Sequence, residues 1–438
     1  MAFTYDTTTD IGKVRLLIHD QVNLPDHPAH YSDAEIQIFL DSGGSVKLAA
    51  AEALEAWAAY YSDSPDSEKI GDYCLPDTVE ALSRNGWRRY NELDIGQEIL
   101  AYDSKVDELK WTKILDIYQT QYNGRMLKLE SGFKHITFST LASPNHRWYV
   151  KPLYHTAKWR LRIHKSTELN SWDRIPLSAS YNDGGIRSQW SDEFVECVGW
   201  FVTEGYFQKA KGRRYAAFIS QSQTQNPENC QSIRYCLTRL LGDIPAEHKR
   251  NHHDISFYIG SRTKLYQQLC KVCPNKQLEM RFLNQLTSRQ LRLLWQTMIL
   301  GDGDKERTRF YQQDNETMQS FQALAVLCGF GTYLSQKDRD KTRNEAVFSL
   351  SCLTKIYRGI KALWKGWVDY SGGIWCPSTE LGTWLARSNG FTFITGNSYS
   401  KKGQANMLSL ADRYRKSEEE VPVLEWAEMD LVDGDYEE

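Results

Sequence analysis

Hydrophobic residues recur at helical spacing at both ends of the chain. Near the start, Ser32 and Glu35 occupy the two positions of a capping box ahead of "IQIFL", and "VKLAAAEALEAWAAYY" is rich in strong helix formers. From Ser398 onward, "KGQANMLSLADRYRKSEEE" again spaces its hydrophobic residues as a helix does. The pattern therefore predicts a helical segment at each end of the chain.

Between these ends the pattern changes. From Cys74 to Val150, short segments such as "GQEILAYD" and "RMLKLES" are bounded by turn residues, which is typical of β-strands. Residues from about 155 to 365 mix strands such as "ISFYIGS" with helical runs such as "LLWQTMIL", and β segments return up to Asn397. We interpret Cys74 to Asn397 as an insertion in one helical domain, whose two pieces together have about the length of a small domain.

The composition is that of an ordinary globular protein. The chain has 438 residues, of which 41% are hydrophobic and 25% charged, with a net charge of −3. This length allows about two to four domains. No apolar run approaches the roughly 18 residues that span a membrane, and "MAFTYDTTTD" lacks the pattern of a signal peptide. Nine cysteines, an odd number, are typical of reduced thiols in a cytoplasm, where any special cysteine acts as a nucleophile or a ligand.

The ends of the insertion carry residues that can break and form peptide bonds. A thiol such as that of Cys74 can attack the adjoining carbonyl and produce a thioester, and the hydroxyl of Ser398 can accept the acyl group. The side-chain amide of Asn397 can attack its own backbone carbonyl and release the insertion. His146, supported by Ser143, can protonate the departing amine and help to stabilise an oxyanion. Alone, "FITGNSYS" indicates only a turn and His146 a structural residue, but together in this order they predict protein splicing.

Three separated blocks carry a resemblance to inteins. "CLPDTVEALSRNGWRRYNELDIGQEILAYD" resembles the N-terminal block, "LASPNHRWYV" resembles the block with a Thr-x-x-His element, and "GIWCPSTELGTWLARSNGFTFITGN" resembles the two C-terminal blocks. The resemblance implies an all-β horseshoe of the Hint type, which needs no cofactor for splicing.

The histidines of the C-terminal blocks are missing from this chain. Inteins usually carry a histidine just before the terminal asparagine, where Gly396 stands here, and a second histidine is absent near Gly382 or Thr383. We therefore expect other groups to assist the cyclisation of Asn397.

A further set of residues matches a particular class of intein. Trp148, Cys376 and Thr395 stand at positions that resemble the Trp-Cys-Thr signature of class 3 inteins, many of them from phages. In that class the cysteine of the C-terminal block attacks the upstream junction directly. Cys74 and Cys376 therefore remain alternatives for the first attack, and simple burial remains a further alternative for Cys376.

Two stretches of the interior have the same shape. "VECVGWFVTEGYF" and "LLWQTMILGDGDK" each have an apolar helix, a small residue (Gly199 or Thr297), an acid five positions later (Glu204 or Asp302) and then glycine. They resemble the paired motifs of LAGLIDADG, or DOD-type, homing endonucleases. Small residues let two helices pack closely, which brings the two acids together to share Mg²⁺. Either motif alone would indicate only a buried helix that ends in a turn.

Other polar residues of the middle region have weaker interpretations. Lys276 lies where these endonucleases often carry a lysine and Lys337 is a second candidate, although most lysines are solvated surface residues. Basic patches near residues 158–165, 209–214 and 337–343 could follow DNA phosphates. A lone Cys270-x-x-Cys273 with His252 and His253 upstream is a weak zinc pattern.

The flanking residues resemble small helical head-to-tail connector or adaptor proteins of tailed phages. The resemblance rests on helix patterns and on "IGDYS", formed when the flanks are joined. It implies a homo-oligomeric host protein that is made in the cytoplasm of a bacterium and built into a virion. The acidic end "EEEVPVLEWAEMDLVDGDYEE" is typical of a flexible tail.

The resulting prediction is a multidomain chain whose ranges are an N-extein 1–73, a Hint part 74–152, an endonuclease 153–365 (α/β, pseudo-two-fold, αββαββα-like), a Hint part 366–397 and a C-extein 398–438. Its leading function is self-splicing combined with site-specific cleavage of double-stranded DNA at the insertion site. One alternative is splicing with a domain that only binds DNA, which the intact Glu204 and Asp302 oppose. The other is an unspliced phage structural protein, which the intact Cys74, Asn397 and Ser398 oppose.

Overall fold

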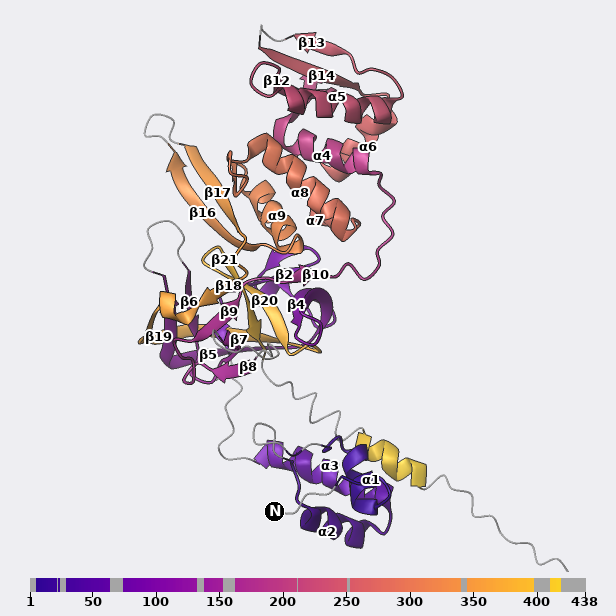
Figure 1. Cartoon of the computed structure of the whole chain (residues 1–438), viewed down its shortest axis with the longest axis vertical. Coiled ribbons are helices and arrows are strands. Elements are labelled where there is room, and N and C mark those ends of the chain that lie inside the picture. The colour runs from indigo at the N-terminus through magenta and orange to yellow at the C-terminus, as the bar shows by residue number, and fades with distance from the viewer. Residues whose placement is uncertain are drawn as a thin grey trace, which may run out of the picture. The chain divides into compact units, whose positions relative to one another are not determined.

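The computed structural model describes most of the chain and divides it into two compact units. The described residues are 5–21, 23, 29–63, 74–131, 138–152, 162–210, 212–249, 253–339, 345–397 and 410–418. One unit combines residues 1–67 with 400–438, and the other holds residues 68–399 (Figure 1).

The first unit is helical and is built from both ends of the chain. Its helices are α1 (Asp10–Leu17), α2 (Asp33–Gly43), α3 (Val46–Asp63) and the helical residues 410–418. Ala411 lies in the same hydrophobic core as Val14, Ile36 and Leu54. Arg415 forms an ion pair with Glu55 at 2.7 Å. The segments before and after the predicted insertion therefore share one core.

Polar groups fix the ends of these helices. The capping box at α2 is confirmed, because the Glu35 side chain accepts from the Ser32 N–H and the Ser32 hydroxyl accepts from the Glu35 N–H. The fully buried Arg15 forms ion pairs with Asp20 at 2.7 Å and with Asp33 at 2.8 Å. A buried guanidinium with two carboxylates is a stabilising arrangement only while all three are present.

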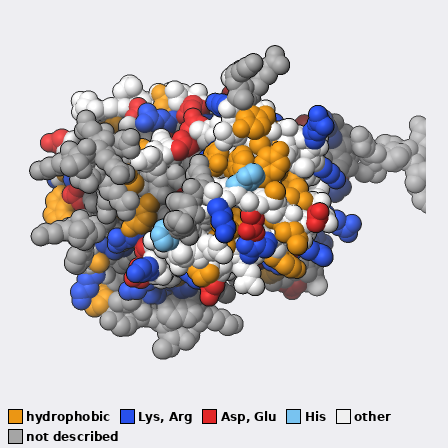
Figure 2. All heavy atoms as spheres, turned by 90° about the horizontal axis from the view of Figure 1, so that it is seen from above, with side chains coloured by type: hydrophobic (Ala, Val, Ile, Leu, Met, Phe, Trp, Pro, Cys, Tyr) orange, Lys and Arg blue, Asp and Glu red, His pale blue; other side chains and the backbone are white. Residues whose placement is uncertain are grey.

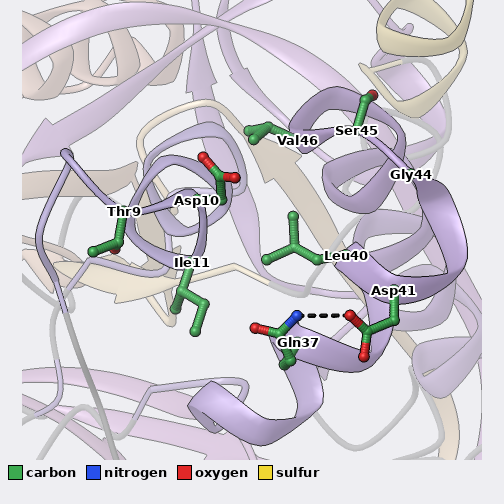
Figure 3. A pocket seen from close by; sticks show the side chains of 9 residues that line it. All are labelled: Thr9, Asp10, Ile11, Gln37, Leu40, Asp41, Gly44, Ser45 and Val46. Atoms are coloured by element: carbon green, nitrogen blue, oxygen red, sulfur yellow. Dashed lines mark hydrogen bonds between the residues drawn. The ribbon is translucent and has the colours of Figure 1, made fainter.

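A surface hollow of about 380 Å³ lies between the start of α1 and the α2–α3 turn (Figure 3). Its polar side chains already serve the local structure: Thr9 caps α1, and the Gln37 amide donates to Asp41 at 2.7 Å. We assign no chemistry to this hollow.

The second unit contains a β region in which the two ends of residues 74–397 meet. Two long strands, β5 (Glu108–Glu130) and β19 (Trp364–Thr379), pair antiparallel from Trp364 opposite Glu130 to Thr379 opposite Ile114. Around them lie the strands β1 (Leu75–Pro76), β2 (Glu80–Ser83), β3 (Gly86–Arg88), β4 (Glu98–Asp103), β6 (Ser139–Ala142), β20 (Thr383–Ser388) and β21 (Phe391–Gly396). Since β1 pairs with β19 at Leu75 opposite Trp375, the first residues of this range lie beside a strand near its end.

Further strands pair beside this region, and all of them except β7 come from the range 153–365 predicted for the endonuclease. A small sheet has the order β18-β9-β7-β8, formed by β7 (Arg147–Pro152), β8 (Arg162–Lys165), β9 (Asp173–Pro176) and β18 (Tyr357–Gly359). The short strand β10 (Ser180–Tyr181) pairs in parallel with β5. Residues 162–181 and 357–359 therefore extend the β region, while the predicted boundaries themselves stay a prediction.

Two α/β repeats follow. The first consists of α4 (Asp192–Glu204), β11 (Gly205–Ala210), β12 (Arg213–Ser222), α5 (Pro227–Leu241), β13 (Glu247–Lys249), β14 (Asp254–Gly260) and α6 (Lys264–Val272). After the short α7 (Met280–Leu283), the second consists of α8 (Ser288–Asp302), β15 (Arg309–Gln312), α9 (Asn315–Leu327), β16 (Gly331–Arg339) and β17 (Glu345–Leu353).

The second repeat departs from the αββαββα expectation. Where the first repeat has the hairpin β11–β12, the second has β15 and an isolated bridge between Gly303 and Phe310. The reason is local, because "GDGDKERT" forms a turn in which the Asp304 carboxylate accepts hydrogen bonds from the N–H groups of Thr308 and Arg309.

The second repeat is also joined to the β region. Strand β16 pairs with β21 at Tyr333 opposite Phe391, so one sheet continues from the repeat into the hairpin β20–β21. Below this pairing, the buried Gln322 of α9 accepts a hydrogen bond from Arg387 at 2.9 Å and donates to the carbonyl of Gly390 at 2.9 Å. Arg387 in turn pairs with Glu80 at 2.6 Å.

No helix among the described residues combines the length and the apolar character that crossing a membrane would require.

Candidate functional site

Residues from both ends of the range 74–397 converge on one buried centre, which we call the junction centre. It contains Cys74, Ser143, His146 and Thr395, all fully buried, and the nearly buried Asn397. Ser398, the predicted acyl acceptor, lies outside the described residues.

The first residue of this range is held by Ser143. The Cys74 N–H donates to the Ser143 hydroxyl at 2.9 Å, and the Ser143 N–H donates to the Cys74 carbonyl at 3.1 Å. The His146 N–H then donates to the Ser143 carbonyl at 3.1 Å, which closes a turn. The nitrogen that must leave in an upstream cleavage therefore already faces a hydroxyl.

The imidazole of His146 connects this turn with strand β21. Its Nε2 atom lies 2.5 Å from the Thr395 hydroxyl, and its ring packs edge-on against Trp148 at a centroid distance of 5.0 Å. Burial, with a smaller contribution from the charge of Arg147, lowers the pKa of His146 to about 3. The ring is therefore neutral at physiological pH and can accept or donate one proton.

The two candidate thiols lie in the same cluster. Strand β1 pairs with β19 at Leu75 opposite Trp375, and continuing this antiparallel register by one residue places Cys74 opposite Cys376. Both cysteines are fully buried and share a cluster with Met126 and Ile374. Geometry alone therefore leaves both thiols as candidates for the first attack.

The last residue of this range is fixed at two atoms. The Asn397 N–H donates to the Gly382 carbonyl at 3.1 Å, and its Nδ2 atom donates to the Thr379 carbonyl at 3.1 Å. The preceding carbonyl, of Gly396, accepts from the indole N–H of Trp384 at 3.2 Å. The side-chain amide is thus held in one orientation beside the bond that it would break.

A second candidate site lies where α4 and α8 end. The helices are in close contact through small residues, because a Cβ on Gly199 would lie 2.8 Å from Thr297, and a Cβ on Gly301 would lie 2.4 Å from Thr203 (Figure 1). The predicted pairing of small residues thus recurs one turn later, with glycine and threonine exchanged between the helices. This packing brings the last residues, Glu204 and Asp302, into one electrostatic environment.

The two acids have perturbed protonation. Burial, followed by the charge of Asp302, raises the pKa of Glu204 to about 7. Burial also raises the pKa of Asp302. Lys276 lies close enough to oppose both shifts, and burial lowers its own pKa. Its Nζ atom donates to the Thr203 carbonyl at 2.9 Å.

Each acid has a glutamine partner that the sequence did not reveal. The Gln221 amide of β12 donates to Glu204 at 3.2 Å, and the Gln312 amide of β15 donates to Asp302. The two acid–glutamine pairs occupy corresponding places in the two repeats, but the sequence separation between acid and glutamine differs. The reason is that the second repeat has one strand fewer between its acid and its glutamine. The relation between the two glutamines is visible only when their positions on β12 and β15 are compared in the structure.

The carboxylates fit a divalent cation. Two nearby acids whose pKa values are raised by burial are stabilised when a cation binds between them, and Mg²⁺ needs only one or two protein carboxylates beside water and phosphate oxygens. No group of three or more His, Cys, Asp or Glu side chains suited to a metal occurs in the described part of the chain. Cys270, Cys273 and His253 are therefore not gathered into a zinc site, and His252 lies outside that part.

The remaining basic candidates are less well placed. The side chain of Lys337 and most of the patches at 158–165 and 337–343 lie outside the described side chains. In the patch at 209–214, Arg214 is already engaged with Asn275 at 3.2 Å and with the ring of Phe207. Figure 2 shows lysine and arginine side chains dispersed over one face of the molecule beside a group of hydrophobic side chains.

Comparison with known proteins gives distant similarities. No protein-family model matches the chain. The chain is 21% identical over 370 residues to the ribonucleoside-diphosphate reductase subunit beta of Aquifex aeolicus, a match that covers 74% of this chain and about half the length of that protein. The flanks are about a quarter of the chain, so a match of this extent must include most of residues 74–397.

Solved structures show similarities of the same weak kind. A variant of the AceL NrdHF class 3 split intein is 6% identical over 75% of this chain and all of that chain, with a TM-score of 0.30. Variants of the homing endonuclease I-DmoI are 14% identical over 37% of this chain and 84% of theirs, with a TM-score of 0.30. An intein-like domain from Clostridium thermocellum is 15% identical over 24% of this chain and 66% of that chain, with a TM-score of 0.19. These values do not establish a family or a fold.

Proposed function

We propose that residues 74–397 form an intein that excises itself, ligates its flanks and carries a DNA endonuclease. The observation that carries the proposal is the junction centre, because it holds Cys74 and Asn397, the first and last residues of the range 74–397, together with His146. A second thiol, that of Cys376, lies in the same cluster as Cys74. A structural role alone would not require a cysteine, a neutral buried histidine and an asparagine at the two ends of the same range.

The upstream step follows from the contacts of Cys74. A thiol, from Cys74 or Cys376, attacks the carbonyl before Cys74, so that an S–C bond forms as the C–N bond breaks. The departing nitrogen takes up one proton. Ser143 already contacts that nitrogen, and the neutral His146, held by Thr395, supplies and recovers the proton.

The later steps use the downstream end. The Ser398 hydroxyl takes the acyl group and the thiol is restored. The Nδ2 atom of Asn397 then forms a cyclic imide with its own backbone carbonyl, and the bond to Ser398 breaks. The freed amine finally attacks the ester, which produces a peptide bond between the flanks. In this scheme the contact from Asn397 to Thr379 keeps Nδ2 oriented before attack.

For the α/β repeats we propose hydrolysis of phosphodiesters in double-stranded DNA at the insertion site. Glu204 and Asp302 would hold Mg²⁺, and the ion would supply activation of a water and stabilisation of the leaving oxygen. Lys276 lies beside both acids and can neutralise a scissile phosphate. Gln221 and Gln312 orient the two carboxylates.

The sheet faces opposite the helices suit contact with DNA. On the first sheet, Tyr206, Phe218, Tyr258 and His248 form one group of rings with centroid distances of 5.3 to 5.9 Å. Such polar and aromatic faces can contact bases and phosphates.

We further propose that the ligated flanks are a phage connector-like protein, made in a bacterial cytoplasm and assembled into a virion as an oligomer. The support is that α1, α3 and residues 410–418 already share one core and the Arg415–Glu55 ion pair. Joining the flanks would therefore give this helical domain a continuous chain.

Intact mass after expression in a reducing cytoplasm tests splicing. Two products, the ligated flanks and the free 74–397 element, support the proposal, and a single 50.7 kDa species contradicts it. For the nuclease, a supercoiled plasmid carrying the joined flank coding sequence is incubated with the protein and Mg²⁺. A double-strand break supports cleavage, and an intact plasmid favours a domain that only binds DNA.

A further inference from the structure

The structure explains why no histidine precedes Asn397. A Cβ on Gly396 would lie 2.5 Å from the carbonyl oxygen of Arg147 and 2.9 Å from its Cβ atom. The first of these contacts is with backbone, which cannot rotate away. Any side chain at position 396 would therefore displace the strand that carries Thr395 and Asn397.

The second missing histidine leaves a space above Gly382. This residue has a φ of +72°, a conformation that disfavours residues with a side chain. The point where its Cβ would lie is 3.3 Å from the Tyr149 hydroxyl and 3.8 Å from the Oδ1 atom of Asn397. The hydroxyl and the cyclising amide thus lie at the same small space, from which a side chain at 382 is absent.

Neighbouring side chains of strand β7 lie on opposite faces of the strand and approach different parts of the junction centre. Successive side chains of a strand point to opposite sides. Trp148 packs on His146 and on Phe393, whereas the next residue, Tyr149, reaches toward Gly382 and Asn397. Only about 8% of Tyr149 is exposed, so its hydroxyl acts in a site with little water.

We infer that Tyr149 is the residue that moves the proton in the cyclisation of Asn397, in place of the two absent histidines. The inference rests on the proposed splicing function. The Nδ2 atom forms a bond to the Asn397 carbonyl carbon and loses one proton, while the bond to Ser398 breaks and its nitrogen gains one proton. Tyr149 donates its phenolic proton to that nitrogen and recovers the proton released by Nδ2, so no co-reactant is needed.

A phenol suits this role. A phenolic hydroxyl carries a proton that it can donate, and its oxygen can take a proton back. The Thr379 carbonyl, which binds Nδ2, can orient the amide but cannot return a proton. The Tyr149 hydroxyl, by contrast, carries an exchangeable proton beside the space that the amide oxygen of Asn397 also borders.

Tyr149→Phe tests the inference, because it removes the hydroxyl and keeps the ring. We expect release of the imide-terminated element to slow at least about tenfold, within the range for loss of a general acid–base group. Upstream cleavage, followed separately as thioester that hydroxylamine traps, should keep its rate. Tyr102→Phe is the matched control: it removes another buried hydroxyl, which donates to Asp107 at 2.8 Å, and should leave both rates unchanged.

A second readout separates proton transfer from packing. Replacing Tyr149 by 3-fluorotyrosine lowers the phenol pKa with almost no change in size, and should move the high-pH decline of the cyclisation rate to lower pH. An unshifted profile, or equal loss of upstream cleavage in Tyr149→Phe, overturns the inference. If the wild type releases neither product, the proposed function fails; if wild type and Tyr149→Phe cyclise equally fast, only this inference fails.

Discussion

Replacing Glu204 by glutamine should abolish DNA cleavage and at the same time stabilise the protein. The pKa of Glu204 is raised from 4.5 to about 7, first by burial and then by the charge of Asp302. A carboxyl with a raised pKa binds its proton more tightly in the folded state. Its contribution to stability is therefore largest below pH 4.5 and is lost as the pH rises toward 7.

The size of the effect follows from the shift. Each pKa unit corresponds to 1.36 kcal/mol, so the ionised Glu204 destabilises the folded state by about 3 kcal/mol at pH 8.5. Because the side chain is only partly buried, we expect about 2 kcal/mol from Glu204→Gln. At about 2.1 cal/mol/K per residue, a unit that spans residues 68–399 would show a rise of about 3 °C in the unfolding midpoint.

The assay is thermal unfolding in EDTA at pH 8.5 and at pH 5, with plasmid cleavage in Mg²⁺ measured in parallel. The stabilisation should shrink at pH 5, where wild-type Glu204 is protonated. Glu306→Gln removes a nearby exposed carboxylate and should change neither stability nor cleavage. Equal midpoints for wild type and Glu204→Gln at pH 8.5, or a gain that does not depend on pH, would refute the electrostatic reasoning.

Other predictions concern the junction centre and its support. One of Cys74→Ala and Cys376→Ala should abolish upstream cleavage, and splicing by both variants would exclude the thiol mechanism. Thr395→Val removes the partner of His146 and should slow upstream cleavage at least about tenfold, while binding of target DNA in a gel-shift assay stays unchanged. Since the pKa of His146 is lowered to about 3, the upstream rate should show no inflection near pH 6.5, and such an inflection would mean that another group titrates. Gln322→Leu removes three buried hydrogen bonds, to Thr332, to Gly390 and from Arg387, and chemical denaturation should show a loss of about 1–3 kcal/mol; an unchanged midpoint would mean that the other partners of these groups compensate.

Short-range patterns in the sequence predicted local structure well. The capping box of Ser32 and Glu35 needs only four residues, and the structure confirms it. The small residues Gly199 and Thr297 were identified from their spacing before an acid, and they do face each other. Helix-period and strand-period patterns also separated the helical flanks from the β region.

Relations between distant residues could not be read in the same way. Gln221 and Gln312 meet their acids only because strands return along the helices, and the second repeat changed the spacing by losing one strand. Cys74 and Cys376 lie opposite each other through the pairing of β1 with β19, which joins segments about 300 residues apart. The assignment of residues 162–181 to the β region likewise depends on tertiary pairing rather than on hydrophobic period.

The hairpin β20–β21 links the two candidate activities physically. Its turn is made by Asn389 and Gly390, both with positive φ, the sequence that a tight two-residue hairpin favours. Beside this turn, Gln322 and β16 of the second repeat bind Gly390 and pair with Phe391. At the other end the same strand carries Thr395 to His146.

A consequence concerns which part of residues 74–397 splicing can dispense with. The first repeat contributes no strand to the sheet that contains β21, whereas the second repeat continues it and shields the buried Arg387. Removing α9 and β16 would expose the ion pair between Arg387 and Glu80 and would free one edge of β21, the strand that precedes Asn397. The second repeat is therefore part of the framework that positions the junction centre, whereas the first repeat is joined to that framework through the packing of α4 on α8 and not through the sheet.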